Sequence, residues 1–379
     1  MAWGAPSNGQ TFSGISRSLV GQMARRNVLR GEYSLKNLKL TDLLRRAASL
    51  RRTPLGFGLG VSRAWLWSEQ TSRILQQRLA RTLEASGDRG SFLQIGTFIE
   101  IDRRFGEYAT FSDMTIPQAY SVGQFSVSKL TRRQYHQAVA VQRRVLHEAA
   151  HVFTLSEWAR QSVILDLGVN PDRVTTIYGG PNVNIPVHSD IPRKPHQILY
   201  VGIDWHRKGG PQVVEGFRHF RQRVPDAELV IVGCSPKINC TGVRVEGYLH
   251  INDPAAQKRL SRLYAESAIF TLMSSFEPLG IAFIEAFAMG LPVVAYRSGS
   301  RAEIVHEGQS GLLCEDREPK TISDAFYRLL SNPKEREAMG KYAKNLVKTE
   351  LNWDSAVSKI IEKFGPASHQ KNGKYLSVR

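Results

Sequence analysis

Hydrophobic residues in the second half of the chain fall into short unbroken runs, and amphipathic segments separate these runs. The runs predict strands over residues 196–203, 227–234, 268–274 and 291–296, and the intervening segments predict helices over 209–224, 254–267 and 280–290. Continuous apolar strands that alternate with helices indicate a parallel sheet covered on both faces. This half of the chain is therefore predicted to be a doubly wound α/β domain.

The first half follows the same alternation less clearly. It predicts a loop that leads into a helix over 11–29, a helix over 64–86, a strand over 91–99, a helix that runs into a strand over 134–153, and a helix over 155–168 with Ser156 as its N-cap. A doubly wound domain opens with a strand, and only about ten residues precede the loop SGIS. Either the first strand is therefore expected to be short, or the given start of the sequence is wrong.

A chain of 379 residues exceeds the usual size of a single core, so two domains are expected. Residues 178–195 contain four prolines and two glycines without periodicity, which is typical of a linker. We therefore predict an N-terminal domain over 1–190 and a C-terminal domain over 191–349, in which one long helix covers 323–351. Residues 350–379 are predicted to form a last helix, for which packing back on the N-terminal domain is one option, and a polar tail.

The composition narrows the class of protein. No apolar run is long enough to span a bilayer, and the first residues resemble neither a secretory nor a transit signal. The three cysteines, Cys234, Cys240 and Cys314, have neither metal-ligand spacing nor an even number for a disulfide framework. A cytoplasmic protein without a cofactor or a bound metal is the simplest interpretation.

The net charge of +17 has a local source, because residues 17–52 contain ten basic residues and two acidic ones. Such a segment attracts nucleic acid, anionic lipid or phosphorylated substrates. Nucleic acid is disfavoured because Tyr33 is the only aromatic residue in the segment. A segment that adheres to an anionic membrane and a basic face exposed to solvent both remain open.

The segment SSFEPLGIAFIE, residues 274–285, places Glu277 and Glu285 on either side of Gly280 where a strand is expected to give way to a helix. Doubly wound folds bind ligands at the carboxyl ends of their strands, and the first N–H groups of a helix attract phosphate. Carboxylates beside a phosphate accept hydrogen bonds from sugar hydroxyls. The segment therefore predicts a nucleotide-sugar site.

A second motif, YVGIDWHRKGG over residues 200–210, follows another predicted strand. Its Arg207 and Lys208 are suited to neutralise a diphosphate leaving group. A basic pair in a loop is by itself more often solvated than functional. It gains weight here because an anion-binding helix is predicted in the same domain.

Taken together, these motifs resemble retaining glycosyltransferases of the GT-B fold, in glycosyltransferase family 4. The resemblance rests on the two glutamates, on VGIDWHRKGG, LVIVGC, VRVEGYL and GLPVVAYRSGSRAEIVHEGQSGLL, and extends upstream through HVFTLSEWARQSVILDLGVNPDRVTTIYGGPN. It covers roughly residues 109–332. It implies an α/β fold of two doubly wound, Rossmann-like parallel-sheet domains that face a central cleft.

The resemblance also implies roles for individual residues. Glu277, Lys208 and Arg207 would carry the reaction: Glu277 on the donor sugar hydroxyls, and the two cations on the diphosphate. Arg207 would substitute for an arginine that the family often has where Ile203 stands. The implied substrate-binding residues are Gly14, Asp113, Tyr248, Leu249, Leu279, Gly280, Ile281, Ala282 and Glu285.

Within that set, Glu285 would hold the ribose, and the backbone of Tyr248 and Leu249 the nucleobase. Residues 279–282 would bind the phosphates, and Gly14 would face the diphosphate across the cleft. Many family members place a histidine of the N-terminal domain near the donor sugar. Here Asp113 occupies the corresponding loop, while His147 and His151 fit a helix and a core edge equally well.

The implied reaction is transfer of a hexosyl group from a UDP-, GDP- or ADP-sugar, with retention of configuration and without a metal. The nearest match to an Asp-x-Asp metal motif, EID at residues 100–102, is interpreted as the end of a strand. The acceptor would be a glycan, a lipid-linked glycan or a glycolipid in polysaccharide biosynthesis, which fits an enzyme on the inner face of a membrane. The alternatives are a sugar-nucleotide epimerase or phosphorylase of the same fold, and a catalytically silent basic binding protein.

Overall fold

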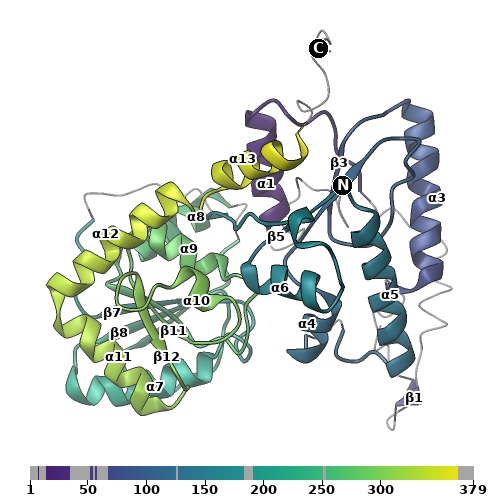
Figure 1. The fold of residues 1–379 in the computed structure, drawn as a ribbon. Coiled ribbons are helices and arrows are strands. Elements are labelled where there is room, and N and C mark those ends of the chain that lie inside the picture. The colour runs from purple at the N-terminus through teal and green to yellow at the C-terminus, as the bar shows by residue number, and fades with distance from the viewer. Residues whose placement is uncertain are drawn as a thin grey trace. The chain divides into compact units, whose positions relative to one another are not determined.

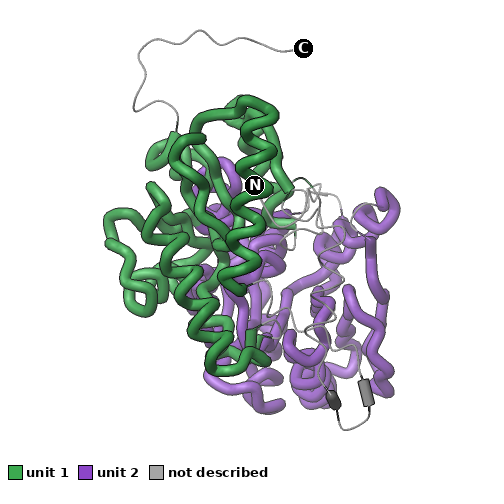
Figure 2. Tube along the Cα trace, turned by 90° about the vertical axis from the view of Figure 1, so that its right-hand side faces the viewer, with its two compact units in different colours: residues 1–177, 356–379 green, residues 178–355 purple. Residues whose placement is uncertain are grey.

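The computed structural model describes residue 7 and residues 14–34, 52–53, 56–57, 67–124, 127–182, 191–250 and 253–365. The chain divides into two compact units (Figure 2). Unit 1 comprises residues 1–177 and 356–379, and unit 2 comprises residues 178–355. Within the predicted linker, residues 183–190 lie outside the described residues. Each unit is built around its own parallel sheet (Figure 1).

Unit 2 contains a six-stranded sheet in the order β12-β11-β10-β7-β8-β9. All paired strands in it are parallel. Its strands are β7 (Gln197–Val201), β8 (Glu228–Val232), β9 (Val243–Gly247), β10 (Ile269–Leu272), β11 (Val293–Tyr296) and β12 (Gly311–Cys314). The chain first moves outward from β7 to β9, then returns to the other side of β7 with β10. The predicted doubly wound domain is confirmed, and its strand order reverses between β7 and β10.

Helices cover both faces of this sheet (Figure 1). One face carries α7 (Gly210–Arg223) and α11 (Pro319–Ser331), and the other carries α8 (Pro254–Glu266), α9 (Ile281–Ala288) and α12 (Pro333–Thr349). A short helix, α10 (Arg301–Ile304), follows β11. Five of the six strands are mostly buried, as in β10, where all four residues are buried, whereas the edge strand β9 has no buried residue. The continuous apolar runs of the sequence therefore correspond to a sheet that lacks a solvent-facing side.

The prediction of one long helix over 323–351 is wrong. The chain forms α11 and α12 instead, separated by Asn332. Pro333 has no N–H and its ring would clash with the carbonyl four residues before it, so a helix cannot continue through it unbroken. The Asn332 side chain accepts a hydrogen bond from the Glu335 N–H at 3.2 Å and so caps the new helix.

Unit 1 contains a four-stranded parallel sheet in the order β3-β4-β5-β6. Its strands are β3 (Phe92–Ile95), β4 (Tyr108–Ser112), β5 (His151–Thr154) and β6 (Val174–Thr176), and a separate antiparallel pair joins β1 (Arg52–Thr53) to β2 (Gly56–Phe57). The residues expected to form a short first strand lie outside the described residues, apart from residue 7.

The helices of unit 1 are α1 (Ile15–Arg25), α3 (Glu69–Ser86), α4 (Ile116–Ser121), α5 (Arg132–Glu148) and α6 (Glu157–Leu165), with a 3₁₀ turn at Pro171–Arg173. Ser156 caps α6 as predicted, because its hydroxyl accepts from the Ala159 N–H at 3.2 Å. Leu75, Leu79 and Leu83 form one buried stripe of α3 and pack in the main core of this unit. The last helix, α13 (Trp353–Phe364), contributes Lys359, whose Nζ donates to the Thr176 carbonyl at 3.2 Å.

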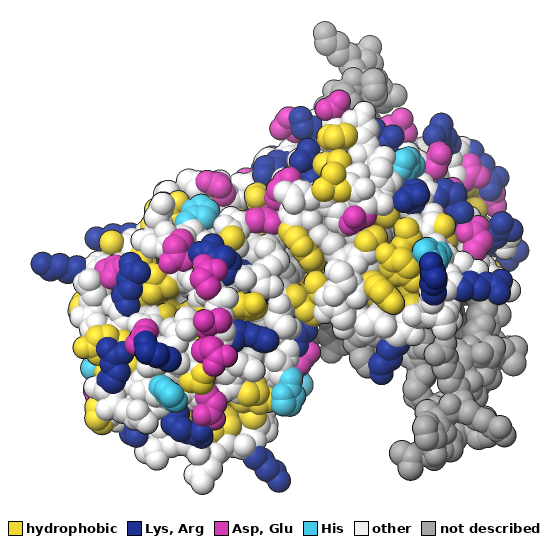
Figure 3. Space-filling view, turned by 60° about the horizontal axis from the view of Figure 1, so that its bottom comes forward, with side chains coloured by type: hydrophobic (Ala, Val, Ile, Leu, Met, Phe, Trp, Pro, Cys, Tyr) yellow, Lys and Arg dark blue, Asp and Glu magenta, His cyan; other side chains and the backbone are white. Residues whose placement is uncertain are grey.

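The basic segment of residues 17–52 is described only in part, because residues 35–51 lie outside the described residues. On the face shown in Figure 3, Lys and Arg side chains are interspersed with Asp and Glu. None of the helices in the described ranges is both long and apolar enough to cross a membrane. Membrane attachment through this segment therefore stays a prediction.

Candidate functional site

The candidate site of unit 2 lies at the carboxyl ends of β7 and β10, where the strand order reverses. In open α/β sheets, the loops after the two strands at such a reversal lead to opposite faces and leave a crevice between them. The loop after β7 carries Arg207 and Lys208, and the loop after β10 carries Glu277. The topology thus brings together three residues that the sequence motifs singled out.

Glu277 is the centre of this cluster. Its side chain is buried, with 5% of the residue exposed. Lys208 Nζ lies 2.5 Å from its Oε1, and an Arg207 terminal nitrogen lies 3.3 Å from the same oxygen. Burial alone would raise the pKa of Glu277, but Lys208 and Arg207 lower it below its usual value. Glu277 is therefore a carboxylate at neutral pH, and a strong acceptor for a ligand hydroxyl.

Arg207 is held from several sides. Its Nη1 also donates to the Phe276 carbonyl at 3.1 Å, and its Nε pairs with Asp204 at 3.2 Å. The guanidinium lies over the Phe276 ring, 5.2 Å from the ring centroid. Ile203, which stands where the family often has an arginine, is 69% exposed. The loop after β7 therefore presents its cations from positions 207 and 208.

Gly209 explains how this loop reaches the neighbouring strand. Its φ of +70° is a left-handed conformation, and a Cβ there would lie 2.1 Å from the Met273 carbonyl oxygen. Only glycine allows both the turn and this approach. The close contact fixes Lys208, one residue earlier, beside the loop after β10.

The loop after β10 leads into α9, which begins at Ile281, close to the start that the sequence predicts. Gly280 is its N-cap with a φ of +92°, and no side chain caps the helix there. A Cβ at Gly280 would lie 2.5 Å from the Phe283 ring. The first N–H groups of α9, together with the helix dipole, form a local positive end that suits phosphate oxygens. Leu279, Ile281 and Ala282 lie along this turn.

Glu285 lies in the second turn of α9 and is 7% exposed. Its Oε2 accepts a hydrogen bond from the Tyr264 hydroxyl of α8 at 3.2 Å. Burial, and then the Glu285 charge, raise the pKa of Tyr264, so this hydroxyl stays a donor. Tyr264 was not foreseen from the sequence, where its apolar neighbours in α8 make it read as a core residue. It orients the carboxylate for which a ribose contact is predicted.

The end of β9 is the most open part of the predicted site. Tyr248 is 50% exposed, and its ring meets that of His250 edge to face with centroids 4.7 Å apart. Leu249, the residue between these two in the sequence, is half-buried. The position after an edge strand leaves backbone groups open to a ligand, and the predicted nucleobase contact there stays a prediction.

Two predicted residues belong to unit 1. Gly14 is the buried N-cap of α1 and has a left-handed φ of +84°. Asp113 directly follows β4 and is half-buried. Burial raises the pKa of Asp113 to about 6, although hydrogen bonds from backbone N–H groups oppose this shift. The roles of both residues toward a ligand stay predictions.

The two histidines considered for the donor sugar are part of the framework of unit 1. His147 Nε2 lies 2.9 Å from the Leu167 carbonyl, and His151 Nε2 lies 2.8 Å from the Thr175 hydroxyl. His151 is buried, and burial, followed by the charges of Lys363 and Arg173, lowers its pKa to about 4. It is therefore neutral in the folded protein at physiological pH.

This burial predicts a pH dependence of stability. Between about pH 6.5 and 4 the unfolded chain binds a proton at His151 and the folded chain does not, so the free energy of unfolding falls as pH falls through this window. The loss is on the order of 2–3 kcal/mol. Urea unfolding between pH 4 and 8 should show a shallower slope in His151→Asn than in the parent, whereas the exposed His136→Asn should leave the slope unchanged. Equal slopes in all three proteins would contradict the assignment.

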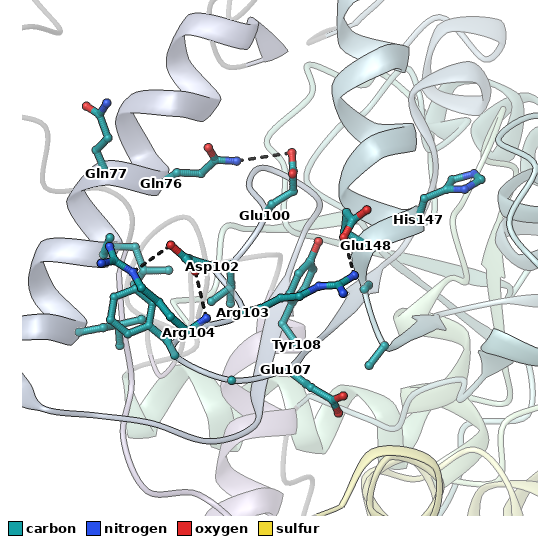
Figure 4. A pocket seen from close by; sticks show the side chains of 18 of the residues that line it. Gln76, Gln77, Glu100, Asp102, Arg103, Arg104, Glu107, Tyr108, His147 and Glu148 are labelled. Carbon is teal, nitrogen blue, oxygen red and sulfur yellow. Dashed lines mark hydrogen bonds and ion pairs between the residues drawn. The ribbon is translucent and has the colours of Figure 1, made fainter.

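A charged hollow of about 1190 Å³ lies at the amino ends of the strands of the unit 1 sheet, whereas Asp113 follows the carboxyl end of β4 (Figure 4). Three of its acidic side chains pair with arginines of the same unit. Asp102 pairs with Arg104 at 2.9 Å, Glu148 pairs with Arg103 at 2.8 Å, and Glu100 pairs with Arg144. The prediction that residues 100–102 end a strand is wrong, because β3 ends at Ile95 and these residues form a loop whose carboxylates bind arginine.

Comparison with known proteins points to one family. Residues 184–346 match the family model described as glycosyl transferases group 1. The chain is 31% identical over 150 residues to an N-acetyl-alpha-D-glucosaminyl L-malate synthase of Bacillus anthracis, covering 38% of this chain and 39% of that enzyme. It is 29% identical over 168 residues to a GDP-mannose-dependent alpha-(1-6)-phosphatidylinositol monomannoside mannosyltransferase of Mycobacterium tuberculosis, covering 41% and 44%. The match thus spans less than half of either relative.

A solved structure, Anabaena HepE in complex with UDP, superposes with a TM-score of 0.57 at 14% identity, over 76% of this chain and 81% of that chain. At this identity the similarity concerns the fold alone. It confirms the predicted fold class, two Rossmann-like α/β units of the GT-B type.

Proposed function

Because residues 184–346 match the family model of glycosyl transferases group 1, we propose that the protein transfers a hexosyl group from a nucleotide sugar to an acceptor, with retention of configuration and without a metal. One observation carries the proposal. A buried carboxylate, Glu277, lies between two cations at the strand-order reversal of unit 2, directly before the uncapped N-terminus of α9. This arrangement provides an acceptor for sugar hydroxyls beside a positive site for a diphosphate.

The chemistry follows from the charges. The bond between the anomeric carbon and the diphosphate breaks with negative charge developing on the leaving phosphate oxygen. The acceptor hydroxyl oxygen bonds to the same carbon, and its proton passes to the leaving phosphate. The charge of Lys208 and the N–H dipoles at the start of α9 are held in place by the fold. They stabilise the leaving oxygen, a role that a metal ion would otherwise have to fill. Glu277 holds the sugar through its hydroxyls, and Glu285, oriented by Tyr264, holds the nucleotide that stays behind.

The substrates are proposed at the level of class. The donor is a UDP-, GDP- or ADP-sugar, and the acceptor is a glycan, a lipid-linked glycan or a glycolipid. One relative supports this range, since it is named as a GDP-mannose-dependent mannosyltransferase that acts on a phosphatidylinositol monomannoside. The basic segment of residues 17–52 supports work at the cytoplasmic face of a membrane.

A donor screen tests the proposal. The protein is incubated with UDP-, GDP- and ADP-hexoses, with and without EDTA, and release of the nucleoside diphosphate is measured with oligosaccharide and glycolipid acceptors or with water. We expect one base to raise the melting temperature and to give release that EDTA leaves unchanged. Binding of none of the three bases would overturn the proposal, and release that requires a divalent metal would overturn its metal-free part.

Product analysis by mass and by anomeric NMR completes the test. A transfer product adds one hexosyl residue to the acceptor and keeps the configuration of the donor. An isomer of the donor with unchanged mass would instead identify an epimerase.

A further inference from the structure

The loops after three neighbouring strands of unit 2 are joined by hydrogen bonds around Glu277. The Ser275 N–H donates to the Arg207 carbonyl at 2.8 Å, which joins the loops after β10 and β7. The Ser298 hydroxyl donates to the Ser275 carbonyl at 2.9 Å, and the Ser300 hydroxyl donates to the Glu277 carbonyl at 3.1 Å. These bonds fasten the loop after β11 to the loop that carries Glu277. The residue after Ser300 therefore belongs to the same cluster.

That residue, Arg301, is wholly buried, with 0% of its surface exposed. Its Nε donates to the Tyr296 carbonyl, but both terminal nitrogens lack a hydrogen-bond partner among the described residues. Burial lowers its pKa to about 10, and the attraction of Glu277 partly opposes this shift. Arg301 is therefore a charged guanidinium at neutral pH with four N–H donors unused.

Such a group is costly in a folded protein. A buried guanidinium whose two terminal nitrogens have no hydrogen-bond partner loses their hydration, and a carboxylate that it does not touch compensates for little of this loss. The other two cations of the cluster are satisfied, since Lys208 pairs with Glu277 and Arg207 pairs with Asp204 and Glu277. Among the three cations in the described part of the site, Arg301 is therefore the one whose terminal nitrogens still lack an anionic partner.

We propose that Arg301 is a donor-binding residue whose terminal nitrogens bind an anionic oxygen of the nucleotide sugar. This inference rests on the proposed function and adds a third cation to it. Two parts of a donor carry such oxygens: the diphosphate, and the carboxylate of a uronic acid sugar. Both present paired oxygens that match the fork of a guanidinium. The segment SGSRAE around Arg301 lies within one of the motifs that carry the family resemblance, but nothing in the sequence assigned a role to Arg301 itself.

The variant Arg301→Met separates binding from folding. Met fills a similar volume without a charge, and replacement of an unpaired buried cation by an apolar side chain is often neutral or stabilising. The Tyr296 carbonyl loses its donor, but the unpaired terminal nitrogens are also removed, so we expect the melting temperature to change little, together with at least about tenfold weaker binding of the anionic group. Arg301→Lys keeps the charge but loses the fork, and we expect intermediate binding.

Arg193 provides the matched control. Its terminal nitrogens donate to the Ser267 and Met289 carbonyls at 2.6 and 2.5 Å, so its guanidinium is satisfied within unit 2. Arg193→Met should lower the melting temperature, because it leaves two carbonyls without their donors, and should leave ligand affinity unchanged. The two arginines are thus expected to give opposite patterns.

Calorimetric titration with inorganic pyrophosphate, with UDP, GDP and ADP, with the matching nucleosides, and with UDP-glucose and UDP-glucuronate distinguishes the sources. A loss in Arg301→Met for every diphosphate but for no nucleoside assigns the residue to the diphosphate. A loss confined to UDP-glucuronate assigns it to a sugar carboxylate. Equal affinities in Arg301→Met and the parent would overturn the inference, as would a fall in melting temperature that Arg301→Lys restores without any change in affinity.

The outcomes also separate this inference from the proposed function. A parent protein that binds no nucleotide of the screen overturns the proposed function itself. A parent protein that binds and transfers, beside an Arg301→Met variant that does both equally well, overturns only the role of Arg301.

Discussion

Glu277→Gln is expected to lower kcat for sugar transfer by about 10²–10³-fold, the range typical for loss of one preorganised polar contact in an active site. The amide cannot carry the charge that makes Glu277 a strong acceptor for sugar hydroxyls. It also releases Lys208 and Arg207 from their shared carboxylate. We therefore expect the nucleoside diphosphate alone to bind as tightly as in the parent, or more tightly, while transfer is lost.

Steady-state kinetics and titration with the diphosphate measure both effects in one variant. Glu215→Gln is the matched control, because Glu215 is a half-exposed glutamate of α7 whose carboxylate pairs with Arg218 at 2.6 Å and not with the cations around Glu277. It should change neither kcat nor affinity. A Glu277→Gln protein with unchanged kcat would show that Glu277 does not position the sugar.

Gly209→Ala is expected to destabilise unit 2 by about 3–5 kcal/mol, which combines left-handed strain with a backbone clash. The added Cβ would lie 2.1 Å from the Met273 carbonyl oxygen, so either the loop after β7 or the end of β10 must move. Lys208 moves with the loop, and we also expect weaker donor binding. Urea unfolding and nucleotide titration measure the two effects.

Gly308→Ala separates strain from clash. Gly308 has nearly the same φ, +71°, but a Cβ there would meet nothing within 4 Å. Its cost should be about 1 kcal/mol, with no change in affinity. If the two variants lose equal stability, the close approach of Gly209 to β10 does not contribute to folding.

The fold of unit 2 was predictable because its strands other than the edge strand β9 are buried on both faces, which leaves continuous apolar runs such as that of β7. Elements with a less regular sequence pattern, such as β4, could not be predicted in this way. In β4, all five residues are buried, but Tyr108, Thr110 and Ser112 are polar and interrupt the hydrophobic run. The break between α11 and α12 was also missed, because the amphipathic pattern continues across it although Asn332 and Pro333 mark the end of a helix.

The candidate site could be predicted where a motif sits in one loop, and not where it depends on tertiary contacts. Residues 277–285 and 207–208 follow predicted strands, so their placement at one edge follows from parallel topology. Arg301 stands among Ser, Gly and Ala, and its burial follows only from the pairing of β11 with β10. Tyr264 likewise gains a partner on α9 only when α8 and α9 share one face of the sheet.

The reversal of strand order in unit 2 also determines when the site can form during folding. The strands β7, β8 and β9 can pair as the chain emerges, but they leave one edge of β7 open until β10 arrives. Arg207 and Glu277 are 70 residues apart, so their contact requires closure of a long loop. Ligand-binding competence is therefore expected to appear late in refolding, after most of the secondary structure, and to depend on β10 reaching that open edge before another chain does.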